Sequence, residues 1–108
     1  MTAYAIAHLR QVDFGPAIIE YLRRIDATLE PFGGRFVVHG ATVEVLEGQW
    51  PGDIVVIAFA DLATARAWYA SPAYQAILGL RTDHSRGEVI LVPGCDADHK
   101  GADLLAAA

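Results

Sequence analysis

The prediction of the fold starts from the stretch at positions 65–75, Ala-Arg-Ala-Trp-Tyr-Ala-Ser-Pro-Ala-Tyr-Gln. Proline disfavours helical geometry in the residue before it, so Ser71 is expected to leave a first helix. Its hydroxyl can then cap a second helix in which the proline takes the first position, where a missing N–H is harmless. Around this corner stand Trp68, Tyr69 and Tyr74, aromatic side chains that need apolar packing and a partner for the polar tip. We therefore expect two helices in immediate succession that form one wall of a pocket.

The composition indicates a single globular domain. The chain has 108 residues, of which 54% are hydrophobic and 19% charged, and its net charge is −5. It has no block of Lys and Arg for nucleic acid, no apolar run near the roughly 20 residues that span a bilayer, and no pattern of a secretory signal at its start. The single cysteine excludes an intrachain disulfide and a cysteine-based zinc cage. We expect a cytoplasmic protein with no nucleic-acid or membrane partner.

The apolar pattern predicts an order of strand, helix, strand, strand, helix pair and strand. Strands are expected at 3–9, 35–40, 54–59 and 89–92, a short strand or arm at 43–46, and helices from 16 to Pro31, at 62–70 and at 72–83. Strict alternation would place Arg35, Val37 and His39 on one face of the second strand. Two βαβ halves of this kind form a four-stranded antiparallel sheet with helices on one face, which is a ferredoxin-like α+β fold.

The strands carry apolar residues on both faces, although the predicted helices cover only one. A second copy of the chain that packs against the open face is the simplest cover, so we expect a homodimer. The domain is assigned to residues 1–94. Residues 95–108 are expected to form a tail that docks on the body or on a neighbouring subunit.

Four motifs together resemble a known family. They are Gly33-Gly34-Arg35-Phe36, the run Leu-Glu-Gly-Gln-Trp-Pro at 46–51, the run Ala-Trp-Tyr-Ala-Ser-Pro-Ala-Tyr-Gln at 67–75, and Leu80-Arg81. In this order they are similar to domain-of-unknown-function family thirteen-thirty, within the dimeric α+β barrel superfamily. The resemblance implies the ferredoxin-like fold and the dimer, and it supplies no reaction. His39 stands where the family usually has arginine.

The candidate catalytic residues are His39, Glu47 and Tyr69. A strand histidine can act as a general base, and Glu47 could fold back to orient it. Tyr69 could donate a proton to a developing oxyanion. The alternatives are a histidine bonded to a nearby carbonyl or carboxylate, a solvated loop carboxylate, and a tyrosine that belongs to the core.

The candidate ligand-binding residues are Trp50, Tyr74 and Arg81. Arg81 lies on the core-facing side of its predicted helix, and a guanidinium there must meet a carboxylate, carbonyls or an anionic ligand. Trp50 is either a lid over a pocket or a plug against a partner subunit, and Tyr74 either contacts a ligand or packs in the core. No metal-ligand spacing, phosphate loop, nucleophile elbow or dinucleotide fingerprint is present, so no metal or cofactor is expected.

These residues leave the function open between three classes. The favoured class is a cofactor-free enzyme that acts on a small anionic molecule by acid–base chemistry. The alternatives are a module that binds or senses a small ligand, and a structural dimer whose aromatic side chains fill the cavity completely.

Overall fold

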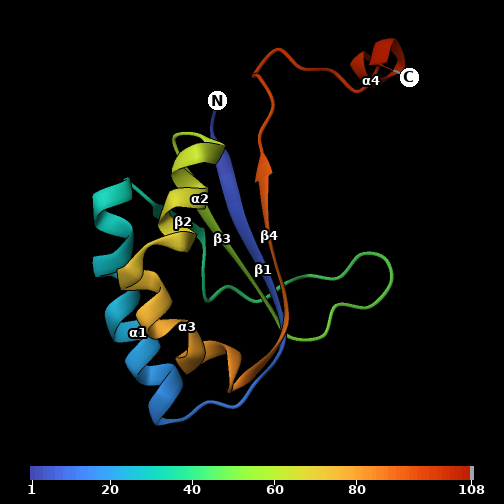
Figure 1. The fold of residues 1–108 in the computed structure, drawn as a ribbon. Helices are drawn as coiled ribbons and strands as arrows, with labels where there is room; N and C mark the ends of the chain where they lie inside the picture. The colour runs from blue at the N-terminus through green and yellow to red at the C-terminus, as the bar shows by residue number, and fades with distance from the viewer. Residues whose placement is uncertain (108) are drawn as a thin grey trace.

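The computed structural model describes residues 1–107 and arranges the domain in two layers, a β-sheet and helices on one of its faces (Figure 1). The elements are β1 (Ala3–Val12), α1 (Pro16–Leu29), the 3₁₀ helix η1 (Glu30–Phe32), β2 (Arg35–Val38), β3 (Asp53–Phe59), α2 (Leu62–Ala70), α3 (Pro72–Thr82), β4 (Ser85–Pro93) and α4 (Asp103–Ala107). The predicted order is confirmed. The first and last strands are longer than predicted, and residues 43–46 form no strand.

The sheet has four strands in the order β2-β3-β1-β4, and every neighbouring pair is antiparallel. Ala5 of β1 stands opposite Ile57 of β3 and Leu91 of β4, and these side chains face the helices. This strand order, with a helical connection in each half, is the ferredoxin-like arrangement. The predicted α+β class is therefore confirmed.

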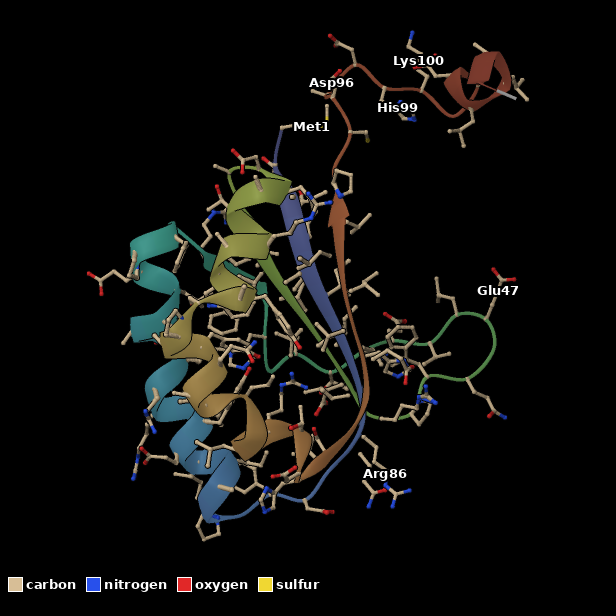
Figure 2. All side chains as sticks on the ribbon, in the orientation of Figure 1. Met1, Glu47, Arg86, Asp96, His99 and Lys100 are labelled. Atoms are coloured by element: carbon tan, nitrogen blue, oxygen red, sulfur yellow. The ribbon has the colours of Figure 1, made fainter. Side chains whose placement is uncertain are left out.

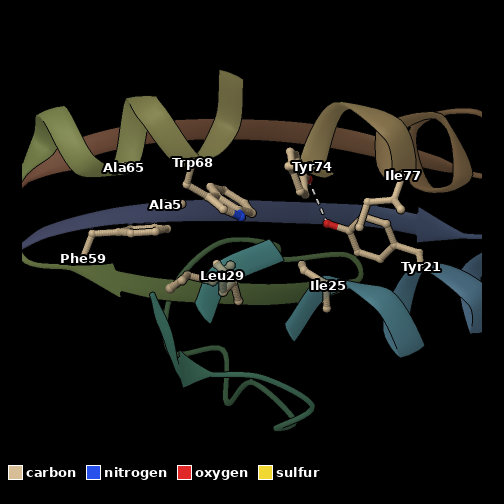
Figure 3. Packing of buried hydrophobic residues seen from close by; sticks show 10 residues of the cluster. Ala5, Tyr21, Ile25, Leu29, Phe59, Ala65, Trp68, Tyr74 and Ile77 are labelled. Atoms are coloured by element: carbon tan, nitrogen blue, oxygen red, sulfur yellow. Dashed lines mark hydrogen bonds between the residues drawn. The ribbon is translucent and has the colours of Figure 1, made fainter. Parts of the chain in front are cut away.

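The core lies between the inner face of the sheet and the three larger helices (Figure 3). It consists of ten buried residues: Ala5, Tyr21, Ile25, Leu29, Ile57, Phe59, Ala65, Trp68, Tyr74 and Ile77. Trp68 is at its centre, because its ring lies 4.1 Å from that of Tyr74 and 5.4 Å from that of Phe59, measured between centroids. The indole N–H donates to the hydroxyl of Thr28 at 3.0 Å, which satisfies its one polar group.

The corner between α2 and α3 has the predicted structure. The hydroxyl of Ser71 donates to the carbonyl of Trp68 at 2.6 Å and accepts from the backbone N–H of Tyr74 at 3.3 Å. One side chain therefore closes the end of α2 and caps the start of α3. Asp61 caps α2 in the same manner, accepting from the backbone N–H of Thr64 at 2.7 Å. The two caps define the residues at which α2 and α3 begin.

One extra residue in β2 changes the face on which His39 lies. Phe36 and Val38 pair with adjacent residues of β3, so Val37 is an additional residue and the strand has a β-bulge. A shift of one residue reverses the face of each side chain beyond it. The prediction that His39 shares a face with Arg35 and Val37 is therefore wrong. Its ring stacks on that of Phe36 instead, with the ring centroids 4.3 Å apart and the ring planes 15° from parallel.

Two glycines allow the strands to approach β1 closely where the sheet curls. A Cβ atom on Gly52 would lie 1.9 Å from the carbonyl oxygen of Leu9, and one on Gly87 would lie 1.9 Å from that of His8. No other residue fits at either position without movement of the backbone. The curl brings the ends of β1 and β4 toward α1 and α3 (Figure 1).

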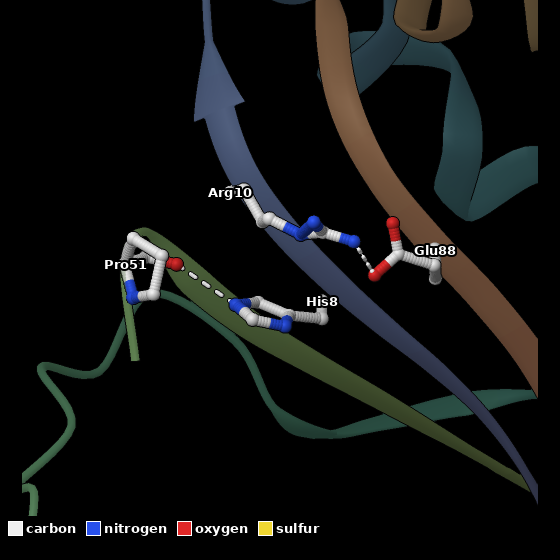
Figure 4. Close-up of polar contacts among 4 residues, drawn as sticks. All are labelled: His8, Arg10, Pro51 and Glu88. Atoms are coloured by element: carbon white, nitrogen blue, oxygen red, sulfur yellow. Dashed lines mark hydrogen bonds and ion pairs between the residues drawn. The ribbon is translucent and has the colours of Figure 1, made fainter. Parts of the chain in front are cut away.

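The other face of the sheet is apolar and has no helix over it. Its register places these side chains on it: Ile6, Ile54, Val56, Ile90 and Val92. Ile90 is 53% exposed. At one end of this face, the Nε2–H of His8 donates to the carbonyl of Pro51 at 2.8 Å, and Arg10 forms an ion pair with Glu88 (Figure 4). We call this surface the open face.

The tail beyond β4 extends away from the domain and ends in α4 (Figures 1 and 2). Leu104 and Leu105 are exposed in the single chain, the latter at 77%. Docking of the tail on the body or on a neighbouring subunit stays a prediction. Within residues 1–107, no helix has both the length and the apolar character needed to cross a membrane.

Candidate functional site

A cavity of about 90 Å³ lies between the inner face of the sheet and the helices. Most of its wall is apolar, with side chains from β1, β3, β4 and α1. The polar groups along it belong mainly to four residues: Tyr21, His39, Tyr74 and Arg81. An apolar chamber with a few convergent polar groups is the usual form of a small-molecule site.

Three of these residues form one polar cluster. The phenol oxygens of Tyr21 on α1 and Tyr74 on α3 are 2.8 Å apart and share a hydrogen bond (Figure 3). Arg81 follows Tyr74 by two helical turns, so both side chains lie on the same face of α3. Its Nη2 donates to the Tyr74 oxygen over a long 3.5 Å, and its guanidinium carbon lies 5.8 Å from the centre of the Tyr21 ring. The cation therefore rests against two phenols.

Burial keeps the phenol of Tyr21 neutral. Removal from water raises its pKa far above the ordinary value, and the adjacent Tyr74 raises it further. Burial alone lowers the pKa of Arg81, but the neighbouring Tyr74 and Tyr21 phenols raise it by more. The cluster consequently combines a permanent cation with neutral hydroxyl groups.

Arg81 has no carboxylate partner within residues 1–107. The ion pairs there join Arg10 to Glu88, Arg24 to Glu20, and His99 to Asp103, and all of these side chains are at least one-third exposed. A partly buried cation with only neutral neighbours has lost hydration without gaining a counter-charge. From the sequence, the partner of Arg81 could be a carboxylate, backbone carbonyls or an anionic ligand. Within residues 1–107 the structure shows no carboxylate beside it.

His39 reaches the same cavity because of the β-bulge. Its ring lines the wall beside Phe36, and neither ring nitrogen makes a hydrogen bond to another described residue. His39 and Arg81 therefore line the same cavity. His39 is exposed at the rim of the cavity, and its ring nitrogens are available to a ligand.

The other three predicted site residues lie outside the cavity. Tyr69 packs behind Tyr74, with ring centroids 5.5 Å apart, and does not line the wall. Trp50 stacks on His8 beside the open face, with centroids 3.9 Å apart and planes 16° apart. Glu47 is exposed and points outward from the 40–52 loop, and no ion pair joins it to His39 (Figure 2). The chamber therefore contains half of the predicted set.

Tyr21 was missed by the sequence reasoning, although a signal was present. The sequence of this helix carries Ile18, Leu22 and Ile25 at helical spacing, as an apolar stripe. Tyr21 is three residues after Ile18 and four before Ile25, so it lies on the same helix face. It is buried, whereas Leu22 is exposed. A tyrosine centred on the apolar stripe of α1, opposite the arginine of α3, could have been assigned to the site.

The described residues offer no obvious place for a metal. Within 1–107, no three His, Cys, Asp or Glu side chains come close enough together to hold an ion. Gly33 and Gly34 lie between η1 and β2, where Gly33 adopts a left-handed φ of 64° and ends the helix. This turn shapes the chain and does not surround a phosphate-sized space.

Solved structures with the same fold come from several bacteria. A protein of unknown function from Rhodopseudomonas palustris is 16% identical with a TM-score of 0.65, over 88% of this chain and 83% of that one. A dimeric ferredoxin-like protein of unknown function from Jannaschia is 15% identical with a TM-score of 0.61, over 89% and 100%. The cofactor-independent oxygenase SnoaB from Streptomyces nogalater is 15% identical with a TM-score of 0.54, over 92% and 96%. Identities this low show the fold alone.

No curated protein matches the sequence. The family model described as Domain of unknown function (DUF1330) matches residues 2–95, which are the whole sheet and the helices packed on it. The tail with α4 falls outside this match. The chain therefore belongs to the DUF1330 family.

Proposed function

We propose that the cavity binds a small anionic molecule, with Arg81 as the residue that holds its charge. The observation that carries this proposal is the Arg81 guanidinium, which lies in a mostly apolar wall against two phenols and faces no carboxylate within residues 1–107. An anionic ligand would supply the missing counter-charge at a place where water is scarce, and there an ion pair is stronger than at the surface. A planar carboxylate also matches the two parallel N–H groups of a guanidinium.

The size and lining of the chamber suggest which anions fit. At about 90 Å³ it is smaller than the roughly 150 Å³ engineered cavity that admits benzene. It therefore suits a compact ligand of on the order of four to six non-hydrogen atoms. The wall from β1 is aliphatic, and α1 adds aliphatic side chains on either side of Tyr21. We infer a short carboxylic acid with an apolar body, such as propionate or isobutyrate.

Calorimetric titration with short carboxylates tests the proposal. Wild type should bind at least one of them, and Arg81→Gln should lose at least tenfold in affinity, because a hydrogen-bonded ion pair is removed. Arg66→Gln is the matched control, since it makes the same change on the exposed side of α2. Equal affinities for the two variants would contradict the assignment, as would the absence of binding by any member of the series.

His39 supports a second candidate, acid–base catalysis on the bound anion without a cofactor. Its ring lines the same chamber as Arg81, and its nitrogens make no hydrogen bond within the described part of the chain. Imidazole exchanges protons near neutral pH, and a base needs a free nitrogen near its substrate. SnoaB, which has the same fold, is described as a cofactor-independent oxygenase, so this architecture is compatible with chemistry that needs no bound cofactor.

Turnover assays on the ligands that bind separate the two candidates. If His39 is the acid–base group, His39→Gln should abolish turnover and leave binding within a few fold of wild type. His84→Gln is the control, because His84 is exposed and its Nδ1 hydrogen-bonds the carbonyl of Leu80 at 3.2 Å. Binding without product in wild type would favour a binding or sensing module.

We also propose that two chains associate through the open face. Ile6, Ile54 and Ile90 form part of a continuous apolar surface there, and monomeric proteins rarely leave such a patch in water. The Jannaschia protein of the same fold is described as dimeric. Trp50 lies beside this face, so the interpretation of Trp50 as a plug against a partner subunit belongs to this proposal.

A further inference from the structure

Two phenols that share one hydrogen bond have a hydrogen left over. The oxygens of Tyr21 and Tyr74 are 2.8 Å apart, so one hydroxyl donates to the other. Each phenol has a single O–H, and only one of the two can point along this bond. Whichever arrangement holds, the second O–H remains unused by the pair. Arg81 cannot take it, because a guanidinium has no acceptor.

The unused hydrogen is free to point toward the proposed anion site. Tyr21, Tyr74 and Arg81 all line the cavity, and no carboxylate or carbonyl within residues 1–107 accepts from either phenol. The burial of Tyr21 raises its pKa, so its proton is retained across the physiological range. The cluster thus offers the chamber both N–H and O–H donors.

We propose that the Tyr21–Tyr74 pair is a shared hydroxyl donor that, together with Arg81, selects a carboxylate oxygen. This rests on the proposed anion site and adds a specificity-determining function for two residues of its wall. The pair has a property that a lone tyrosine lacks. Removal of either hydroxyl also removes the hydrogen bond between the two phenols. The O–H of the remaining phenol can then donate to the ligand. Only removal of both eliminates the donor.

Phenylalanine substitutions, with propionate as the probe, test whether one O–H donor remains until both phenols are removed. Tyr21→Phe and Tyr74→Phe should each bind within about threefold of wild type. The double variant should lose roughly tenfold or more, because a hydrogen bond to a charged acceptor is removed. The effect is therefore strongly non-additive, which a double-mutant cycle measures directly. Circular dichroism and thermal unfolding of the free proteins check that each variant is folded.

The outcomes separate the shared hydroxyl donor from the anion binding on which it rests. If propionate and its homologues do not bind wild type, the anion site itself is refuted. If they bind and Arg81→Gln weakens them, but the double phenylalanine variant binds like wild type, then the anion site stands and the shared donor is refuted. A single variant that loses as much as the double would also refute the shared donor, since one phenol would then act alone.

A variant that keeps both hydroxyls covers the case in which the double substitution does not fold. Replacement of Tyr74 or Tyr21 by 3-fluorotyrosine makes the phenol more acidic and a stronger donor, with little change in volume. Propionate should then bind tighter, by roughly two- to threefold, at a pH where the fluorinated phenol is still protonated. Unchanged or weaker binding in both fluorinated proteins would count against the pair as donor.

Discussion

Trp68→Ala is predicted to destabilise the protein severely, because Trp68 is packed on all sides. The side chain is 2% exposed, and its ring contacts those of Phe59, Tyr69 and Tyr74. Truncation removes most of a large aromatic group and leaves a void between the sheet and the α2–α3 corner. Changes of this kind in protein cores lower the free energy of unfolding by about 3–5 kcal/mol.

The hydrogen bond of the indole makes a smaller and separable contribution. The indole N–H donates to Thr28, whose hydroxyl itself donates to the carbonyl of Ile25 at 2.7 Å. Because Thr28 keeps that second bond, loss of the indole does not leave its hydroxyl unpaired. Trp68→Phe should therefore cost less than the alanine variant, with about 1 kcal/mol from the hydrogen bond and the remainder from lost volume.

Equilibrium unfolding in urea, followed by far-ultraviolet circular dichroism, measures both variants. Fluorescence is unsuitable as the sole probe because the substitution removes one of the two tryptophans. The measurement should be repeated at several protein concentrations, since a dimer gains apparent stability with concentration. A change below about 1 kcal/mol for Trp68→Ala would refute the assignment of Trp68 to the core.

Three further predictions concern the site and the interface. Arg81→Met should abolish carboxylate binding and change the free energy of unfolding of the ligand-free protein by less than about 2 kcal/mol, because no carboxylate within residues 1–107 loses an ion pair; a loss above about 2 kcal/mol in urea unfolding would instead show a structural role. Ile90→Asp should shift the protein from dimer to monomer in analytical ultracentrifugation, whereas Ala63→Asp on the exposed side of α2 should not; a wild type that sediments as a monomer would refute the interface. Above about pH 10 the unfolded chain loses the Tyr21 proton that the folded chain retains, so the stability falls as the pH rises, and Tyr21→Phe should show a shallower fall in thermal melts between about pH 9 and 11.

The sequence predicted the fold well because its local signals agree with one another. The Ser-Pro corner, the Gly33–Gly34 turn and the apolar run at 54–59 each strongly restrict the conformation of the chain. They are also spaced so that the elements between them have the lengths that a ferredoxin-like sheet needs. Local chemistry and global topology therefore point to the same structure.

The site was predicted only in part, because its geometry depends on events that a periodic pattern does not record. Tyr74 and Arg81 follow helical spacing and were found. His39 was named for its chemistry but assigned to the wrong face, since strict alternation has no provision for an inserted residue. Glu47 and Trp50 lie in the irregular 40–52 loop, and no periodicity specifies where such a segment carries its side chains.

The added residue at Val37 sets the faces on which Val38 and His39, the residue just beyond the end of β2, carry their side chains. Shortening the chain by that single position, with no change of chemistry elsewhere, would rotate the imidazole from the ligand chamber toward the surface where a second subunit is proposed to sit. The number of residues in β2, rather than their type, then decides whether the His39 side chain lies on the face with the cavity or on the open face. Anyone transplanting the site onto another sheet would have to carry the insertion along with the side chains.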